Sequence, residues 1–171
     1  MYCLKLYIRP TSGMTFRRLP SSMVHISTYP FLPPTSLSGY LRRLKIIQKG
    51  ELPETKVKDP DYYALPQKFH PLGAYPSPPE AFSIHTTRRQ GIRSFGHTDF
   101  SKIKREAGEN YQLHSWEYLF ADKLVGYVLS DDQEALETLI TVENMGCKIG
   151  KEGYAFVEEI SGIIFLHEEK I

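Results

Sequence analysis

The sequence predicts an α+β fold of the ferredoxin-like type, with the element order βαββαβ and both helices on one face of the sheet. Three observations support this prediction. Segments with alternating apolar and polar residues, typical of half-buried strands, open and close the chain. Two segments carry apolar residues at helical spacing. When a proline-rich insertion is set aside, the segments follow one another as strand, helix, strand, strand, helix and strand.

The first third of the chain is expected to form a strand, a loop and a helix. Residues 2–8 alternate and are followed by Pro10, which predicts the first strand. Residues 23–29 alternate again and predict a short strand. Thr35 and Ser36 follow two prolines at the point where a helix N-cap belongs. The apolar stripe of this helix, which ends at Gly50, consists of Leu37, Tyr40, Leu41, Leu44 and Ile47.

The middle of the chain is expected to be an insertion, about residues 51–110, in a single domain that spans residues 1–171. Residues 51–79 are rich in proline and aromatic residues and are expected to be irregular, as an ordered insertion packed on the domain. This composition is too aromatic for disorder and too rich in proline for the interior of a sheet. Residues 81–89 predict a strand, and residues 91–108 predict a loop or an extended hairpin.

The last third is expected to supply two strands, a helix and a closing strand or hairpin. Residues 111–120 and 123–129 alternate and predict paired strands joined by a tight turn. Residues 130–132 predict the cap of a second helix. Residues 146–153 are expected to form a glycine-rich turn, and residues 154–166 one or two final strands.

Charge is distributed unevenly along the chain. Residues 1–50 contain eight lysines or arginines and no acidic residue, whereas the remainder contains 13 basic and 20 acidic residues. The two parts therefore carry +8 and −7, and the whole chain carries +1. Such a split indicates that the N-terminal part contacts a polyanion. A chance cluster of solvated side chains is the alternative.

Three segments are candidates for contacts with this polyanion. The helix start offers free amides to a phosphate, Ser36 and Ser38 add hydroxyls, and Gly39 lets a backbone approach; a simple capped helix is the alternative. The glycine-rich turn combines backbone freedom with two lysines. Residues 88–93 combine arginines with the nearby Phe95, a mixture suited to single strands, although a solvated loop explains them equally well. Arg17 and Arg18, in the loop after the first strand, are further candidates. The full set of candidate nucleic-acid-binding residues is Arg17, Arg18, Ser36, Ser38, Gly39, Arg42, Arg43, Arg88, Arg89, Arg93, Lys148, Gly150 and Lys151.

Catalytic and metal sites find no support in the spacing of the residues. The six histidines form neither a pair nor a Cys/His pattern with metal-ligand spacing. The sequence contains no nucleophile elbow, P-loop or dinucleotide fingerprint. We therefore predict no catalytic residue, no metal and no cofactor. The apolar runs are too short to cross a membrane, and the start lacks the pattern of a signal peptide, so a cytoplasmic protein is expected.

The segment Tyr29-Pro-Phe-Leu-Pro-Pro-Thr-Ser-Leu-Ser-Gly-Tyr-Leu41 resembles the N-terminal signature of the CRISPR-associated RAMP proteins. It is most similar to that of the Cas-five family, the subunit that caps the 5′ end of the guide RNA in type I Cascade. Residues 114–128 resemble the paired strands of that family, and residues 145–153 occupy the place of its glycine-rich loop. The chain is short for the family, and this loop lacks the arginine often found there, so the subtype stays open.

This resemblance implies a ferredoxin-like domain with a protruding β-hairpin thumb within residues 80–110. It implies a non-catalytic subunit that binds the 5′ handle of the crRNA and contacts the backbone-forming and large Cas subunits. Target nucleic acid would be recognised by guide pairing, in antiviral defence. The alternative is a metal-independent endoribonuclease that processes precursor crRNA, with Tyr40, His97 and Lys102 as conceivable catalytic residues. A stand-alone RNA-recognition domain is a third reading, and the absence of a K/R-G-F-type strand motif counts against it.

Overall fold

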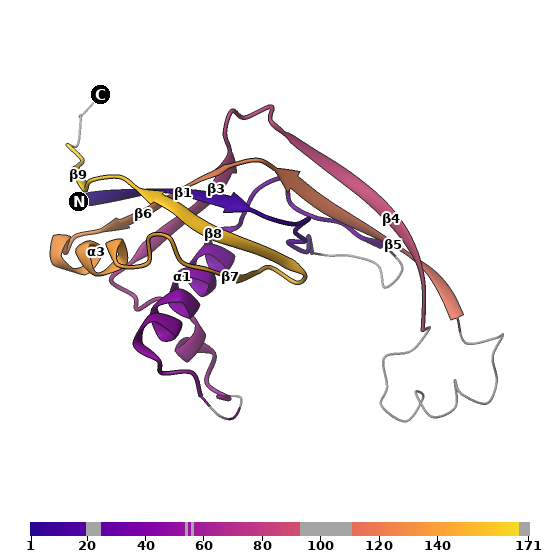
Figure 1. Cartoon of the computed structure of the whole chain (residues 1–171), viewed down its shortest axis with the longest axis horizontal. Helices are drawn as coiled ribbons and strands as arrows, with labels where there is room; N and C mark the ends of the chain where they lie inside the picture. Colours follow the sequence, from indigo (N-terminus) through magenta and orange to yellow (C-terminus); the bar gives the residue numbers. More distant parts are fainter. Residues whose placement is uncertain (20–24, 54, 56, 93–110, 168–171) are drawn as a thin grey trace.

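The computed structural model describes residues 1–19, 25–53, 55, 57–92 and 111–167 (Figure 1). In chain order, its elements are β1 (Tyr2–Pro10), β2 (His25–Ile26), α1 (Pro34–Lys49), the 3₁₀ helix η1 (Pro60–Tyr63), β3 (His70–Pro76), β4 (Phe82–Ile92), β5 (Tyr111–Ala121), β6 (Leu124–Ser130), α3 (Gln133–Ile140), β7 (Gly146–Ile149), β8 (Gly153–Ile160) and β9 (Ile164–Phe165).

The main sheet has the ferredoxin-like strand order. Strands β3, β6, β1 and β8 lie side by side in that order, every neighbouring pair is antiparallel, and β7 pairs with the outer edge of β8. Helix α1 connects β1 to the far edge strand β3, and α3 connects β6 to β7 and β8. Both helices lie on the same face of the sheet (Figure 1). The predicted fold class is therefore confirmed.

The core lies between the main sheet and the two helices. Alternate residues of β1, namely Leu4, Leu6 and Ile8, are fully buried, as are Leu37 and Leu41 of α1. Burying a side chain of this size contributes about 1.5–3 kcal/mol. The period of two in the strand and the period of 3.6 in the helix thus meet in one apolar layer. This layer fixes α1 on the sheet and directs its opposite side outward.

A second sheet, which has three strands, projects from the main domain (Figure 1). Strands β4 and β5 form a long antiparallel hairpin, and β2 pairs in parallel with the other edge of β5. The predicted strand at 81–89 is confirmed as part of β4. The predicted pairing of 111–120 with 123–129 is wrong, because β5 pairs with β4 while β6 belongs to the main sheet. Alternation indicates a strand but does not identify its partner.

Strand β3 lies in the segment that was expected to be irregular. It forms an edge of the main sheet and pairs with β6, with a register shift between Pro71 and Gly73. An interior strand donates amide hydrogen bonds to neighbours on both of its sides, and proline has no amide hydrogen to donate. An edge strand tolerates proline because one of its sides has no neighbour. Gly73 has a φ of 95°, and a Cβ there would lie 2.7 Å from the Leu32 carbonyl. The prediction for residues 51–79 is therefore wrong at this strand, because a proline-rich sequence can still supply an edge.

The helix boundaries follow the predictions with one shift. Helix α1 begins at Pro34, earlier than predicted, with Pro33 as N-cap and no side chain that caps it. Proline suits the first helical position because no amide is needed there. Gly50 ends the helix with a φ of 69°, as predicted. The second helix is capped as predicted, since the Asp132 carboxylate accepts a 3.1 Å hydrogen bond from the Ala135 amide. No helix in the described part of the chain is both long and apolar enough to span a membrane.

Candidate nucleic-acid interface

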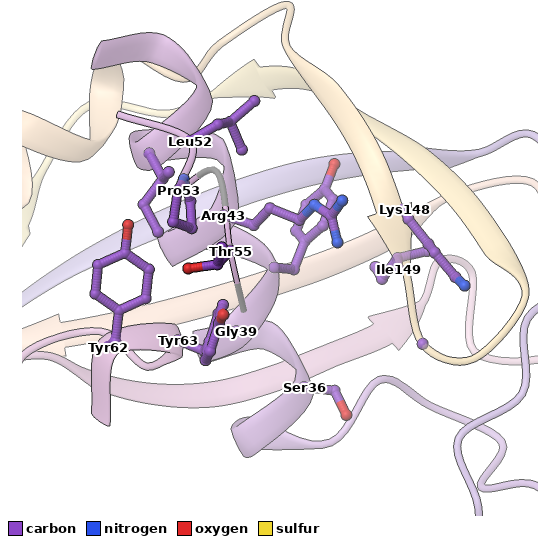
Figure 2. A pocket seen from close by; sticks show the side chains of 13 residues that line it. Ser36, Gly39, Arg43, Leu52, Pro53, Thr55, Tyr62, Tyr63, Lys148 and Ile149 are labelled. Carbon is purple, nitrogen blue, oxygen red and sulfur yellow. The ribbon is translucent and has the colours of Figure 1, made fainter. Parts of the chain in front are cut away.

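A cavity of about 540 Å³ lies between α1, the segment that follows it and β7 (Figure 2). We call it the α1–β7 cavity. Arg43 of α1 and Lys148 of β7 line it, although they are far apart in the sequence, and both side chains are exposed. Ser36, Gly39 and Gly150 also line it. Five of the predicted contact residues are therefore brought together in one place.

The position of Arg43 follows from the anchoring of α1. One turn earlier in the helix, Tyr40 is buried, and its hydroxyl donates a 2.9 Å hydrogen bond to the Ala155 carbonyl of β8. This bond ties the middle of α1 to the sheet, so that Arg43 extends along the cavity. The guanidinium also lies close enough to the buried Cys147 to act on it electrostatically. Burial nevertheless raises the pKa of the Cys147 thiol to about 11, with Arg43 acting in the opposite direction.

The glycine-rich turn is shorter than predicted, because residues 146–149 form β7 and residues 150–152 make the turn to β8. Gly150 has a φ of 61°, a left-handed conformation that favours glycine. A Cβ at this position would lie 2.9 Å from both the Phe16 ring and the Thr15 carbonyl. No side chain therefore fits here unless the backbone or the Phe16 ring shifts.

The same turn is attached to the projecting sheet. The Lys151 ammonium lies 3.6 Å from the centroid of the Trp116 ring in β5. Glu152 accepts a 2.7 Å hydrogen bond from the hydroxyl of Tyr118, also in β5. A cation held against an aromatic face is attracted by the ring quadrupole. Lys151 therefore contributes to the junction of the two sheets, whereas Lys148 lies at the cavity.

A second cavity of about 340 Å³ adjoins the first at the start of α1. Ser36 lines both cavities, and Arg17, Tyr29 and Phe31 line the second. The first turn of α1 contains no acidic residue and has no side-chain cap, so the positive end of the helix dipole is not neutralised there. None of the described residues that line either cavity is acidic. The two cavities thus meet at Ser36, and the charged residues of their described lining, Arg17, Arg43 and Lys148, are all basic.

Two predicted contact residues hold the segment that follows α1 instead of lining the cavity. The Ser38 hydroxyl accepts a 2.9 Å hydrogen bond from the Leu65 amide. Arg42 donates a 2.9 Å hydrogen bond from Nε to the Tyr62 carbonyl, and its guanidinium lies 5.4 Å from the centroid of the Tyr62 ring. Successive residues of a helix point about 100° apart, so Arg42 and Arg43 do not face the same way.

The remaining predicted residues lie away from the α1–β7 cavity or outside the described residues. Arg18 is exposed, and its amide donates to the Ser27 carbonyl at 3.0 Å. Arg88 and Arg89 belong to β4 of the projecting hairpin, where they pair with residues of β5. Arg93 lies outside the described residues. The hairpin arginines and the cavity are thus separate basic groups.

The acid-free N-terminal segment does not converge as a whole. Arg9 pairs with Glu158 at 3.0 Å in the main sheet. Lys45 donates to the Thr138 carbonyl at 2.8 Å, near the C-terminal end of α3, and burial lowers the pKa of its ammonium. Arg43 and Arg17 line the two cavities. Only some of the basic residues of the acid-free segment therefore line the cavities.

Sequence reasoning did not identify the apolar part of the α1–β7 cavity. Leu52, Pro53, Tyr62 and Tyr63 line it on the side of the insertion. The available signal was the unusual content of aromatic residues in a proline-rich segment. Such a segment is expected to pack on the domain, but its composition does not say where.

Of the three conceivable nuclease residues, the structure describes Tyr40. Burial raises the pKa of the Tyr40 phenol above its ordinary value, and its hydroxyl is engaged with the Ala155 carbonyl. A phenol in this state keeps its proton at neutral pH and is a poor general base. His97 and Lys102 lie outside the described residues. In the part of the chain that the structure describes, no group of three His, Cys, Asp or Glu residues is placed to hold a metal.

Comparison with known proteins gives structural similarity only. No protein-family model and no curated protein sequence matches the chain. One similar structure is a chain of "Cryo-EM structure of the Type III-B Cmr-beta bound to cognate target RNA", with a TM-score of 0.44 and 14% identity over 91% of this chain and 64% of that chain. Another belongs to "CRISPR RNA-guided surveillance complex", with a TM-score of 0.41 and 15% identity over 88% of this chain and 57% of that chain. This chain therefore spans less than two thirds of either one, and the similarity concerns the fold.

Proposed function

We propose that this chain is a non-catalytic, RNA-binding subunit of a cytoplasmic CRISPR–Cas effector complex of the Cas-five type. It would bind the 5′ handle of the crRNA and contact neighbouring Cas subunits, while target nucleic acid is recognised by guide pairing. One observation carries the proposal. Arg43, Lys148 and Gly150 converge with the uncapped start of α1 on cavities whose described lining contains no acidic residue.

The chemistry of this surface suits an RNA backbone. A phosphate at the α1–β7 cavity meets the guanidinium of Arg43 and the ammonium of Lys148, and charge-assisted hydrogen bonds of this kind are the strong ones. The start of α1 adds partial positive charge. Gly150 places the backbone of the turn at the edge of the same cavity.

Aromatic side chains accompany these cations. Tyr62 and Tyr63 line the first cavity, and Tyr29 and Phe31 line the second. Rings combined with basic residues are typical of proteins that bind single-stranded RNA, because rings stack on bases while cations neutralise phosphates. The resemblance of residues 29–41 to the Cas-five signature supports the choice of crRNA as this RNA.

The proposal is tested by co-purification. The tagged chain is expressed together with a CRISPR array and the neighbouring Cas proteins, and the bound RNA is sequenced. We expect crRNA with a common, repeat-derived 5′ end and co-purified Cas subunits. The Arg43→Gln, Lys148→Gln double variant should lose most of this RNA, whereas Lys49→Gln, which removes an exposed cation from the last turn of α1, should retain it. Co-purified RNA without repeat-derived ends would contradict the proposal. So would equal amounts of bound RNA in the double variant and in the Lys49→Gln control.

The absence of catalysis is tested separately with repeat RNA, in the presence and absence of EDTA. We expect no defined product, in keeping with the raised pKa of Tyr40 and its bond to the Ala155 carbonyl. A defined product that forms in EDTA and disappears with a single substitution, such as Tyr40→Phe, would establish the endoribonuclease instead.

A further inference from the structure

We propose that the α1–β7 cavity receives one unstacked nucleobase of the bound RNA, inserted against the side chains of Leu52 and Tyr63. This inference rests on the proposed function, because the base belongs to the RNA whose backbone Arg43 and Lys148 contact. It adds a base subsite to what is otherwise a phosphate-binding surface.

The cavity is divided into an apolar part and a cationic part. Figure 2 shows Leu52, Pro53, Tyr62 and Tyr63 on one side, Lys148 on the opposite side and Arg43 between them. A nucleotide has the same division, with an apolar ring face and a charged phosphate. A phosphate placed at Arg43 and Lys148 therefore leaves its base beside the apolar part.

Two side chains of the apolar part are exposed to water. Leu52 is 59% exposed and Tyr63 is 40% exposed, although both line the cavity. Ligand pockets are lined mostly by apolar and aromatic side chains, and exposed ones at the mouth of a cavity can cover the apolar face of a ligand. A planar base inserted here would remove the exposed parts of both side chains from water.

The wall of the cavity is already fixed in the absence of RNA. The rings of Tyr62 and Tyr63 pack edge to face, with centroids 5.1 Å apart. The Tyr62 hydroxyl donates to the Glu51 carbonyl at 3.2 Å, and the Tyr63 hydroxyl accepts from the Val57 amide at 3.0 Å. Because these side chains are already held in place, they lose little conformational entropy when a ligand binds.

The volume also fits a single nucleotide. Pockets for small ligands occupy about 300–1,000 Å³, and the α1–β7 cavity measures about 540 Å³. A purine presents a larger ring face than a pyrimidine and should bind more tightly for that reason.

The first test uses mononucleotides and does not depend on the identity of the RNA. We expect 5′-AMP to bind about tenfold more tightly than ribose 5-phosphate in NMR titrations, since stacking on an aromatic side chain supplies a factor of this size. Tyr63→Leu should abolish this ratio, Tyr63→Phe should keep it, and Arg43→Gln should weaken both ligands alike. Leu52→Ala should reduce it, with Leu72→Ala, another exposed leucine, as the matched control. Equal binding of the two ligands to the wild-type protein would overturn the inference.

The second test places the subsite in the RNA. The co-purified RNA sequence is synthesised with one abasic position at a time, and affinities are compared between the wild-type protein and Tyr63→Leu. We expect one position at which loss of the base weakens binding about tenfold in the wild type and has no effect in the variant. RNA that binds without any such coupled position would refute the base subsite and leave the RNA-binding proposal standing. A 5′-AMP preference without RNA binding would instead refute the RNA-binding proposal.

Discussion

The central prediction concerns the double variant Arg43→Gln, Lys148→Gln, because it removes both cations of the α1–β7 cavity and leaves the apolar core untouched. Both side chains are exposed, and neither takes part in the buried layer between the sheet and the helices. The variant should therefore keep the melting temperature of the wild type within about 1–2 °C, as expected for surface substitutions. Its effect on RNA binding can then be assigned to the cavity.

The size of that effect follows from counterion release. Each phosphate contact with single-stranded RNA changes the logarithm of the association constant by about 0.7 for each tenfold change in salt. At 0.1 M salt, one such contact raises affinity roughly fivefold relative to 1 M salt. The loss of both contacts should weaken binding roughly 25-fold at 0.1 M salt and very little at 1 M salt.

The assay is fluorescence anisotropy of a 5′-labelled crRNA handle over a salt series. The slope of log affinity against log salt should be shallower in the double variant by about 1.4. Lys49→Gln removes the same kind of charge from the same helix but lies in its last turn, so its slope should stay close to that of the wild type. A double variant with an unchanged slope would show that these cations do not contact phosphates, and the reasoning would fail.

Three further predictions concern the stability and burial of the fold. Gly150→Ala should destabilise the protein by about 1–3 kcal/mol in urea unfolding, because φ is positive and the Cβ meets the Phe16 ring, whereas Gly162→Ala, which lies in open space, should be neutral. The Cys147 thiol, with its pKa of about 11, stays protonated at pH 8, so iodoacetamide should modify it more than about 100-fold more slowly than an ordinary thiol, and equal rates would contradict its burial. The Ala135 amide and Lys68 lower the pKa of the Asp132 carboxyl in the folded protein. The carboxylate therefore stabilises the fold at pH values above its pKa in the unfolded chain, and this stabilisation is lost as the pH falls through its pKa in the folded protein. Asp132→Asn should lower the melting temperature at pH 7, and the difference in melting temperature from the wild type should shrink as the pH falls below about 4.

Local patterns in the sequence were sufficient for the fold class but not for the assignment of every strand. Helix α1, the capped second helix and the strand at the N-terminus follow from periodicity and capping, which are properties of adjacent residues. Strand β3 was missed because Pro71 and Pro76 argue against an interior strand, and only the sheet reveals that this strand is an edge. Strand β5 was placed in the wrong sheet, because its alternation is the same in a projecting hairpin and in a core sheet.

The candidate site was predictable to a similar extent. Lys148, Gly150 and the start of α1 were each identifiable from residue type and local context. Their convergence was not, since it depends on the packing of β7 and β8 beside α1. The structure was also needed to show that Arg42 binds the insertion and Arg43 lines the cavity, because the sequence does not show on which side of the helix the insertion returns. The position of Tyr63 beside the cavity was not predictable for the same reason, since Tyr63 belongs to the insertion.

The contact between Lys151 and Trp116 gives the protein an intrinsic spectroscopic reporter. Trp116 is the only tryptophan in the chain, and a positive charge held against an indole changes its emission. Because Lys151 directly follows Gly150 in the turn beside the cavity, a ligand that moves this turn alters the distance between the ammonium and the ring. Binding should therefore be visible as a change in native fluorescence without any attached dye, and Lys151→Met should silence that optical signal while the affinity measured by other means is largely kept.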